Sequence, residues 1–506
     1  MTAAAAPRKN SLLLVLFTTG SCVAPFSSIY GSSITIVPIA TIFHPSAPYA
    51  LSSGDPVWVV ACAFVAGGVF TFFVSEFLRR RPKASLRCIA IASLFGQGLT
   101  GLSLYLASPP MYYFTNILFV GPSSVCGMTV GVTYIIREFN AMGMRKGLAS
   151  GLVGPIIGAT TISWMWCFYF YLTVVQVGTL ADGVGRIDLL YYGWAGFLFA
   201  VQMISASCMH PTPAALVAGP SLARQQQNLP SACIPPLPSS PGPLSPQESS
   251  KTCLGQVDLM KGSGAKTFWG FFLVYFVNLL PGMGLKLLSG PIAQFSYSFN
   301  VWEQTVFTNV YLILYALGRL VSPMLCSGTL QVRKFYFWYS LVSAAFLLAT
   351  PGSVLGFTSS TWPSPLLFSF LITAQGFFTG GFKGLQPTML SSLWTWMGSD
   401  EAFSHYDPAP AFAISVGMTN MALCFAGGIG PVTAYCAYVA PEPPGALLLG
   451  GATYEYGYQV WFYLASAAQA FAGCLMYIPR LGVEKYTPRP PPYATTSYPA
   501  SEAPPT

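Results

Sequence analysis

Three basic side chains lie inside apolar segments of this chain: Lys286, Arg319 and Lys383. No aspartate or glutamate falls in the interior of an apolar segment to neutralise them. A lysine or arginine at the centre of a membrane helix costs about 2.5–3.5 kcal/mol on insertion scales. A guanidinium also matches a carboxylate with two parallel hydrogen bonds. The sequence therefore predicts a site for a small anion, with Arg319 as the first candidate to bind it and Lys383 as the second.

Further polar residues could complete this site. Tyr134 and Asn278 could donate hydrogen bonds to a bound solute, and Lys286, beyond Pro281, could attract anions. Each has a structural alternative. Asn278 could bond a neighbouring helix, and Lys286 could anchor its helix at the membrane interface. Arg319 could instead extend along its flexible stem to the cytosolic interface. The helix of Lys383 could end early and leave this lysine at the inner interface.

No constellation of an enzyme is present in the sequence. The three histidines, His44, His210 and His405, lie in loops or at segment ends and do not cluster for metal binding or nucleophile activation. We therefore expect no enzymatic activity, no catalytic residue, no metal and no cofactor. The net charge of +8 is spread over short loops, so we expect no nucleic-acid partner.

Composition indicates that membrane helices position these residues. The chain is 53% hydrophobic and 8% charged, against about 25% charged in soluble proteins. About 20 mainly apolar residues span a bilayer core. The predicted fold class is an all-α polytopic membrane protein with twelve transmembrane helices. The predicted spans are 11–40, 56–77, 88–107, 111–136, 147–175, 189–209, 268–288, 304–326, 335–355, 365–393, 409–438 and 456–478.

These spans form two groups of six around a segment rich in proline and serine. We predict a tail at 1–10, a six-helix bundle at 11–209, a disordered linker at 210–266, a second bundle at 267–480 and a proline-rich tail at 481–506. Of the 23 lysines and arginines, only Arg186 falls in a loop on the predicted outer side. By the positive-inside rule, both termini and the linker are cytosolic. We expect the plasma membrane rather than an organelle membrane.

Two motifs resemble the major facilitator superfamily. After the second span, Glu76 followed by Arg80 and Arg81 resembles its loop motif, in which an acid and basic residues latch neighbouring helices. Arg79 replaces the glycine of that motif. In the fifth span, small residues spaced by four and a proline resemble the glycine-proline helix of facilitator antiporters and would let another helix approach closely. These residues are Gly147, Gly151, Gly154, Pro155 and Gly158.

A narrower resemblance is to the oxalate:formate antiporter and monocarboxylate transporter families. It is carried by GPSSVCGMTVGVTYIIREFNAMGMRKGLASGLVGPIIGA, by the seventh span and by Gly318-Arg319. The resemblance implies two six-helix bundles and an arginine of the eighth helix that meets the substrate carboxylate. Arg319 occupies that position. The chain lacks the eleventh-helix lysine of the antiporters, and the first-helix lysine of the animal monocarboxylate transporters.

The predicted function is a secondary transporter, of symporter or antiporter type, for a small organic anion, a monocarboxylate in the first instance. One alternative keeps the fold and changes the solute to an amino acid or another small molecule. Another is a membrane receptor or scaffold that transports nothing and acts through the linker and tail. Besides the anionic solute and membrane lipid, the tail residues Pro490 to Tyr493 fit a WW-domain ligand, a pattern that chance also produces in a proline-rich tail. We expect a monomer.

Overall fold

The computed structural model describes ten stretches of the 506-residue chain, and every structural statement below concerns these residues. They are 11–43, 55–142, 146–175, 186–209, 263–297, 299–326, 329–355, 365–397, 408–439 and 453–476. All the regular structure in them is helical. Both tails, the segment 210–262 and the residues Pro490 to Tyr493 lie outside them.

Each of the twelve predicted spans coincides with a helix or with consecutive helical pieces. The first half contains α1 (Leu12–Val23), α2 (Phe26–Tyr30), η1 (Ser32–Ile34), α3 (Ile36–Phe43), α4 (Asp55–Arg80), α5 (Pro82–Tyr105), α6 (Pro109–Thr115), η3 (Asn116–Val120), α7 (Gly121–Ala141), α8 (Lys146–Phe170), η4 (Tyr171–Val175) and α9 (Ile187–Cys208). The second half contains α13 (Ser263–Tyr297), α14 (Val301–Leu325), α15 (Thr329–Leu355), α16 (Pro365–Met397), α17 (Pro408–Val439) and α18 (Thr453–Leu475). Within the described residues, seven helices are long and apolar enough to cross a bilayer.

The first predicted span, 11–40, is not one continuous helix. Ser11 caps α1 by accepting from the Leu14 N–H at 3.3 Å, and α1 ends before Ala24 and Pro25. A proline inside a helix removes a backbone donor and disfavours a straight continuation. Serine hydroxyls bond carbonyls at the break, including Ser28 to Pro25 at 3.2 Å. The break sets the direction of α2, which carries Phe26 and Tyr30.

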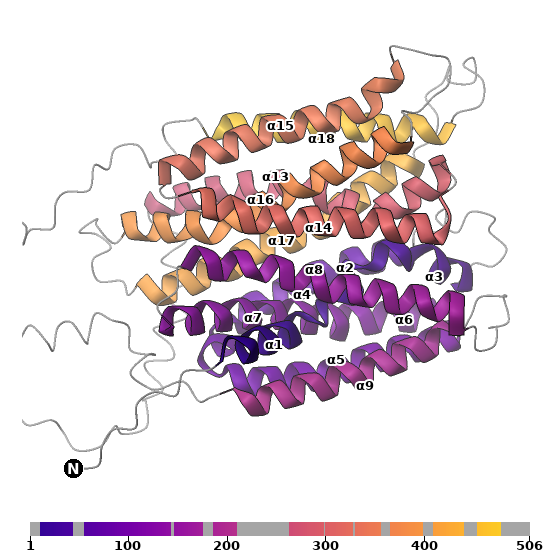
Figure 1. The fold of residues 1–506 in the computed structure, drawn as a ribbon, viewed down its shortest axis with the longest axis horizontal. Coiled ribbons are helices and arrows are strands. Elements are labelled where there is room, and N and C mark those ends of the chain that lie inside the picture. The colour runs from indigo at the N-terminus through magenta and orange to yellow at the C-terminus, as the bar shows by residue number, and fades with distance from the viewer. Residues whose placement is uncertain are drawn as a thin grey trace, which may run out of the picture.

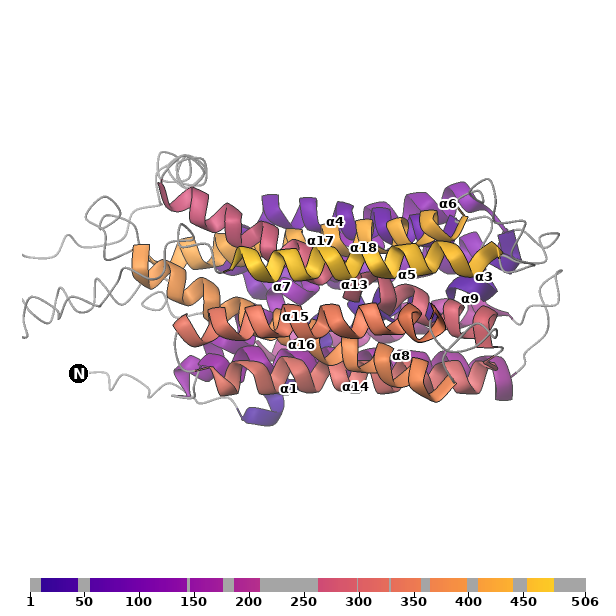
Figure 2. The same cartoon turned by 90° about the horizontal axis from the view of Figure 1, so that it is seen from above.

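The helices form two bundles that lie side by side (Figure 1). They run roughly along the long axis of the molecule, with α15 and α18 at one edge and α5 and α9 at the other. The perpendicular view shows the same common direction (Figure 2). Helices α1 to α9 pack mainly with one another, as do α13 to α18. The bundles meet chiefly where α4 packs on α17 and α8 packs on α14. The described residues thus form an all-α fold of two helical bundles, with helices long and apolar enough to cross a membrane.

Glycines allow the close approach of α8 to α14. Gly151, Gly154 and Gly158 lie on the face of α8 that meets Leu320, Arg319 and Ala316 of α14. An added Cβ at Gly158 would lie 3.4 Å from the Ala316 Cβ, which is ordinary contact, whereas one at Gly154 would overlap Arg319. Pro155 lies within the helix between them. Gly147 belongs to α8 too, but its surroundings lie outside what the structure describes.

Candidate functional site

The three predicted cations lie in the interior of the protein. Lys286 comes from α13, Arg319 from α14 and Lys383 from α16. Their side chains are 2%, 4% and 2% exposed, respectively. Each lysine is also close enough to Arg319 to interact with it electrostatically. Lys286 and Arg319 are buried rather than exposed at the surface of the protein, and α16 continues beyond Lys383 to Met397.

Aromatic rings of both bundles surround the two lysines. The Lys286 ammonium lies against the face of the Tyr30 ring and 5.0 Å from the centroid of the Tyr315 ring. The Lys383 ammonium lies 5.5 Å from the Tyr30 centroid and 5.8 Å from that of Phe26. A cation over an aromatic face is attracted by the ring quadrupole, more strongly where water is excluded. We call Phe26, Tyr30, Lys286, Tyr315, Arg319 and Lys383 the cation cluster.

Hydrogen bonds tie the cluster across the two bundles. The Tyr30 and Tyr315 hydroxyl oxygens are 3.2 Å apart, and the Tyr30 hydroxyl donates to the Met283 sulfur at 3.7 Å. The Lys383 ammonium donates to the sulfur of Met128, on α7, at 3.8 Å. These contacts are made by weak acceptors and by rings. Movement of one bundle against the other would therefore break few strong bonds in the cluster.

The cluster has positive charge without a matching acid. Among the described residues, the Lys286 ammonium and the Nε and Nη1 of Arg319 have no hydrogen-bond partner, and no carboxylate pairs with any of the three cations. A buried charge is costly unless it is paired or hydrogen-bonded. An anion placed among these groups would supply the missing acceptors. The arrangement is chemically suited to binding an anion, and the cluster holds no acid or histidine that could serve as a general base.

Asn278 lies in a different network from the cations. Its side-chain oxygen accepts from the Ser340 hydroxyl at 2.8 Å, and its amide nitrogen donates to the Val274 carbonyl at 2.9 Å. Its backbone carbonyl accepts from Gln469 at 3.1 Å. These bonds join α13 to α15 and α18 inside the second bundle. The structure thus places Asn278 in helix packing, the alternative to a substrate contact.

Tyr134 is also apart from the cluster. It follows Met128 by six residues on α7, about 9 Å along the helix axis. Its ring is buried, its hydroxyl has no partner among the described residues, and the Arg137 guanidinium carbon lies 5.3 Å from the ring centroid. The structure therefore brings together the three cations of the predicted site but neither Tyr134 nor Asn278.

The structure adds residues that the sequence reasoning did not select. Phe26 and Tyr30 bring the first bundle into the cluster, and Met128 accepts from Lys383. Tyr315 lies one turn before Arg319 on α14. Pro25 could have pointed to Phe26 and Tyr30, because a proline predicts a break in the first span beside them. The proline does not show which helix Tyr30 would contact.

The predicted loop latch is only partly described. Arg80 ends α4, and Arg81 stands between α4 and α5 with its side chain exposed. The side-chain contacts of Glu76 lie outside the described part of the structure. The latch therefore stays a prediction.

Comparison with known proteins yields structural relatives alone. No family model matches the chain, and no curated protein matches it. A D-xylose-proton symporter is similar with a TM-score of 0.59 and 12% identity, over 94% of this chain and 99% of that one. The inward open xylose transporter XylE from E. coli follows with a TM-score of 0.56 and 12% identity, over 92% of this chain and 95% of that one. The nucleoside transporter NupG has a TM-score of 0.54 and 14% identity, over 91% of this chain and 99% of that one. At such identities the likeness concerns the fold, and it supports the major facilitator architecture but not the oxalate:formate or monocarboxylate families.

Proposed function

We propose that this protein is a secondary transporter that binds a small organic anion at the cation cluster. The observation that carries the proposal is the burial of Lys286, Arg319 and Lys383 together, with no carboxylate partner among the described residues. A monocarboxylate is the substrate class we favour. A carboxylate oxygen can accept a hydrogen bond from Arg319, whose Nε and Nη1 have no partner among the described residues.

The composition of the cluster supports alternating access. The three cations belong to the second bundle, whereas Phe26, Tyr30 and Met128 belong to the first. Transporters with repeated bundles hold their substrate near the midplane at the interface between the repeats, and rocking of one bundle opens the site to either side. Such rocking would separate Tyr30 and Met128 from the lysines and loosen the site. This proposal makes the protein a carrier rather than an enzyme.

The similar solved structures are named for a sugar and for nucleosides, which are uncharged solutes. A transporter of a neutral small solute is therefore the second candidate. Three buried cations oppose it, because a neutral solute leaves their charges uncompensated. An amino acid is intermediate, because its carboxylate could meet Arg319 while its ammonium would be repelled by the lysines.

Transport should be measured with the purified protein in proteoliposomes. We expect uptake of labelled lactate, pyruvate, formate or oxalate, and competition among these anions but not by xylose or a nucleoside. Arg319→Gln should abolish this uptake. Uptake of xylose or a nucleoside alone, unchanged in Arg319→Gln, would contradict the anion site. If the protein binds these anions but transports none of them, a receptor would be favoured.

A double-mutant cycle tests whether Lys383 shares the ligand with Arg319. If one anion contacts both, the losses of affinity in Lys383→Gln and Arg319→Gln are not additive, with a coupling of about 0.5–3 kcal/mol. We expect oxalate to lose more affinity than formate in Lys383→Gln, because a dicarboxylate can engage two cations. Additive losses that are equal for both anions would assign Lys383 a diffuse electrostatic role.

A further inference from the structure

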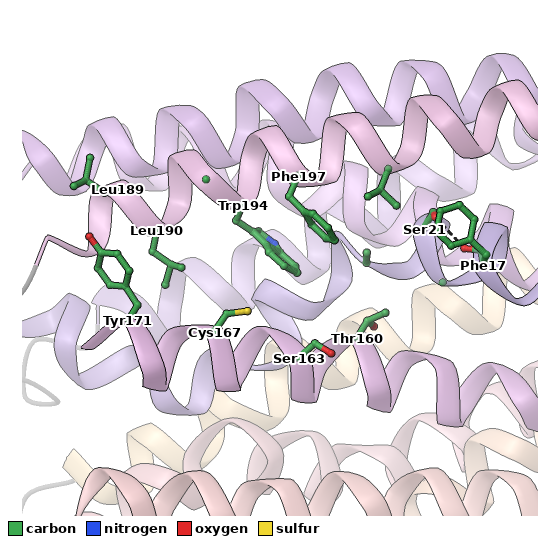
Figure 3. Close-up of a pocket in the computed structure, with 14 residues that line it drawn as sticks. Phe17, Ser21, Thr160, Ser163, Cys167, Tyr171, Leu189, Leu190, Trp194 and Phe197 are labelled. Carbon is green, nitrogen blue, oxygen red and sulfur yellow. Dashed lines mark hydrogen bonds between the residues drawn. The ribbon is translucent and has the colours of Figure 1, made fainter. Parts of the chain in front are cut away.

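A cavity lies on the outside of the first bundle, away from the cation cluster. It is a groove of about 660 Å³ between α8 and α9, with α1 as its floor (Figure 3). Along α9 the groove extends from Leu189 to Val201, a distance of about 18 Å at 1.5 Å per residue. It is therefore long enough for a chain-shaped ligand.

The groove is open to the surroundings of the protein. Large apolar side chains that line it are exposed, with Phe17 at 47%, Phe197 at 52% and Leu189 at 38%. Open apolar surface of this kind on a polytopic chain is covered by lipid or by another protein. Gly193 adds open space, because a Cβ built on it meets nothing within 4 Å.

One polar group in the groove lacks a partner. The hydroxyls of Thr160 and Ser163 donate to backbone carbonyls of their own helix at 3.0 and 2.8 Å. The Tyr171 hydroxyl donates to the Arg186 carbonyl at 2.7 Å. In contrast, the indole N–H of Trp194 has no partner among the described residues, although this side chain is only 8% exposed. A buried donor without an acceptor is destabilising, so an occupant with one acceptor oxygen at this point would be stabilised.

The shape and polarity of the groove select among lipids. Figure 3 shows the rings of Trp194 and Phe197 pointing from α9 toward α8, with Phe17 near the opposite end from Tyr171. The Arg186–Asp188 ion pair and the Tyr171 hydroxyl lie toward the Leu189 end, whereas the Thr160 and Ser163 hydroxyls bond carbonyls of their own helix. An amphiphile would therefore place its polar part at that end and its chain toward Phe17. Rings that project between glycines make an uneven wall, which a flexible chain follows more easily than a rigid fused-ring sterol does.

We infer that this groove is a binding site for one acyl chain of a glycerophospholipid, with an ester carbonyl accepting the hydrogen bond of Trp194. The site is separate from the cation cluster and does not depend on what the protein transports. A sterol and a helix of a second copy of this chain are the competing occupants.

The test uses the full-length protein in vesicles of phosphatidylcholine that carries a photoactivatable diazirine on one acyl chain. After irradiation, adducts are mapped by peptide mass spectrometry. We expect adducts on α8 and α9 at groove residues such as Cys167. Gly193→Leu fills the groove and should reduce these adducts at least fivefold. Gly196→Leu is the matched control, because a Cβ at Gly196 also meets nothing within 4 Å but this glycine does not line the groove.

Trp194→Phe keeps an aromatic ring and removes the N–H donor together with part of the ring system. It should weaken retention of the lipid by about threefold to tenfold, the loss expected for one hydrogen bond. Lipid retention in Trp194→Phe still tests the site if either leucine variant fails to fold. Equal adducts in Gly193→Leu and Gly196→Leu, or no change in Trp194→Phe, would overturn the site. Stronger labelling by a photoactivatable sterol, or crosslinks between two copies through α8 and α9, would overturn the assigned occupant.

Discussion

Gly154 of the first bundle lies directly against the aliphatic stem of Arg319 in the second. A Cβ built on Gly154 would lie 2.5 Å from the Arg319 Cδ and 2.8 Å from its Cβ and Cγ. On the other side, Gly384 of α16 approaches the Arg319 backbone, with its added Cβ 3.0 Å from the Arg319 Cα. Glycines of two helices, one of them from the opposite bundle, thus leave the space that the stem and the backbone of Arg319 occupy.

We therefore expect Gly154→Ala to disturb anion binding. Adding one methyl group in a packed interior costs about 1–3 kcal/mol, and here the displaced atoms belong to Arg319. Anion affinity, measured by titration calorimetry, should fall by about fivefold or more. Gly158→Ala is the control, because its Cβ would make ordinary contact with Ala316 at 3.4 Å. Equal affinities in the two variants would mean that Gly154 serves helix packing alone.

Arg319→Gln should raise the thermal stability of the protein in anion-free buffer while abolishing anion binding. The reason is that the variant removes a buried charge that has no carboxylate partner among the described residues. A fluorescence-monitored melt measures both effects, since anions should raise the melting temperature of the native protein but not of the variant.

Arg333→Gln is the matched comparison for that melt. Arg333 is also buried, but its guanidinium donates to the Met476 carbonyl at 2.6 and 3.2 Å. Its removal should lower the melting temperature and leave anion binding intact. A fall in stability in both variants would show that Arg319 is a structural arginine.

Tyr30→Phe and Tyr30→Leu separate the two contributions of Tyr30 to the cluster. Phenylalanine keeps the ring face against Lys286 and removes the hydroxyl near Tyr315. Leucine removes both. We expect a modest loss of anion affinity in the first and a loss of about tenfold in the second, by equilibrium binding. Similar losses in the two variants would assign the effect to the hydroxyl.

Asn278→Ala should destabilise the second bundle without weakening anion binding. It removes the Asn278 acceptor of the Ser340 hydroxyl, which keeps the Tyr336 carbonyl at 2.7 Å, so the loss is about 0.5–1.5 kcal/mol for one hydrogen bond. We expect a lower melting temperature and an affinity within twofold of the native value. A large loss of affinity at unchanged stability would restore Asn278 as a substrate contact.

The predicted topology is tested with the cysteines of the linker. Cys233 and Cys253 lie in the segment that the charge asymmetry places in the cytosol. A membrane-impermeant maleimide added to intact cells should leave both unlabelled and should label them after permeabilisation. Fast labelling in intact cells would reverse the orientation.

The sequence by itself was sufficient to identify a helical membrane protein and the basic residues inside its apolar spans. In a bilayer, the backbone N–H and C=O groups of a long apolar stretch find partners within a helix. The twelve predicted spans therefore followed from composition and length. Lys286, Arg319 and Lys383 were recognisable because charge in such spans is rare and expensive. These are properties of a residue and its neighbours along the chain, and they need no knowledge of the packing.

Only the tertiary structure decided which residues share a site. Lys286 and Lys383 are 97 positions apart in the printed sequence, yet both lie within cation–π range of Tyr30, a residue whose position depends on the break at Pro25. Asn278, in contrast, is on the same helix as Lys286 but turns toward α15 and bonds Ser340. Periodicity tells which residues share a helix face, whereas the neighbour that each face meets depends on the packing of all the helices. For that reason the cations could be found from the sequence, but the cluster that they form could not.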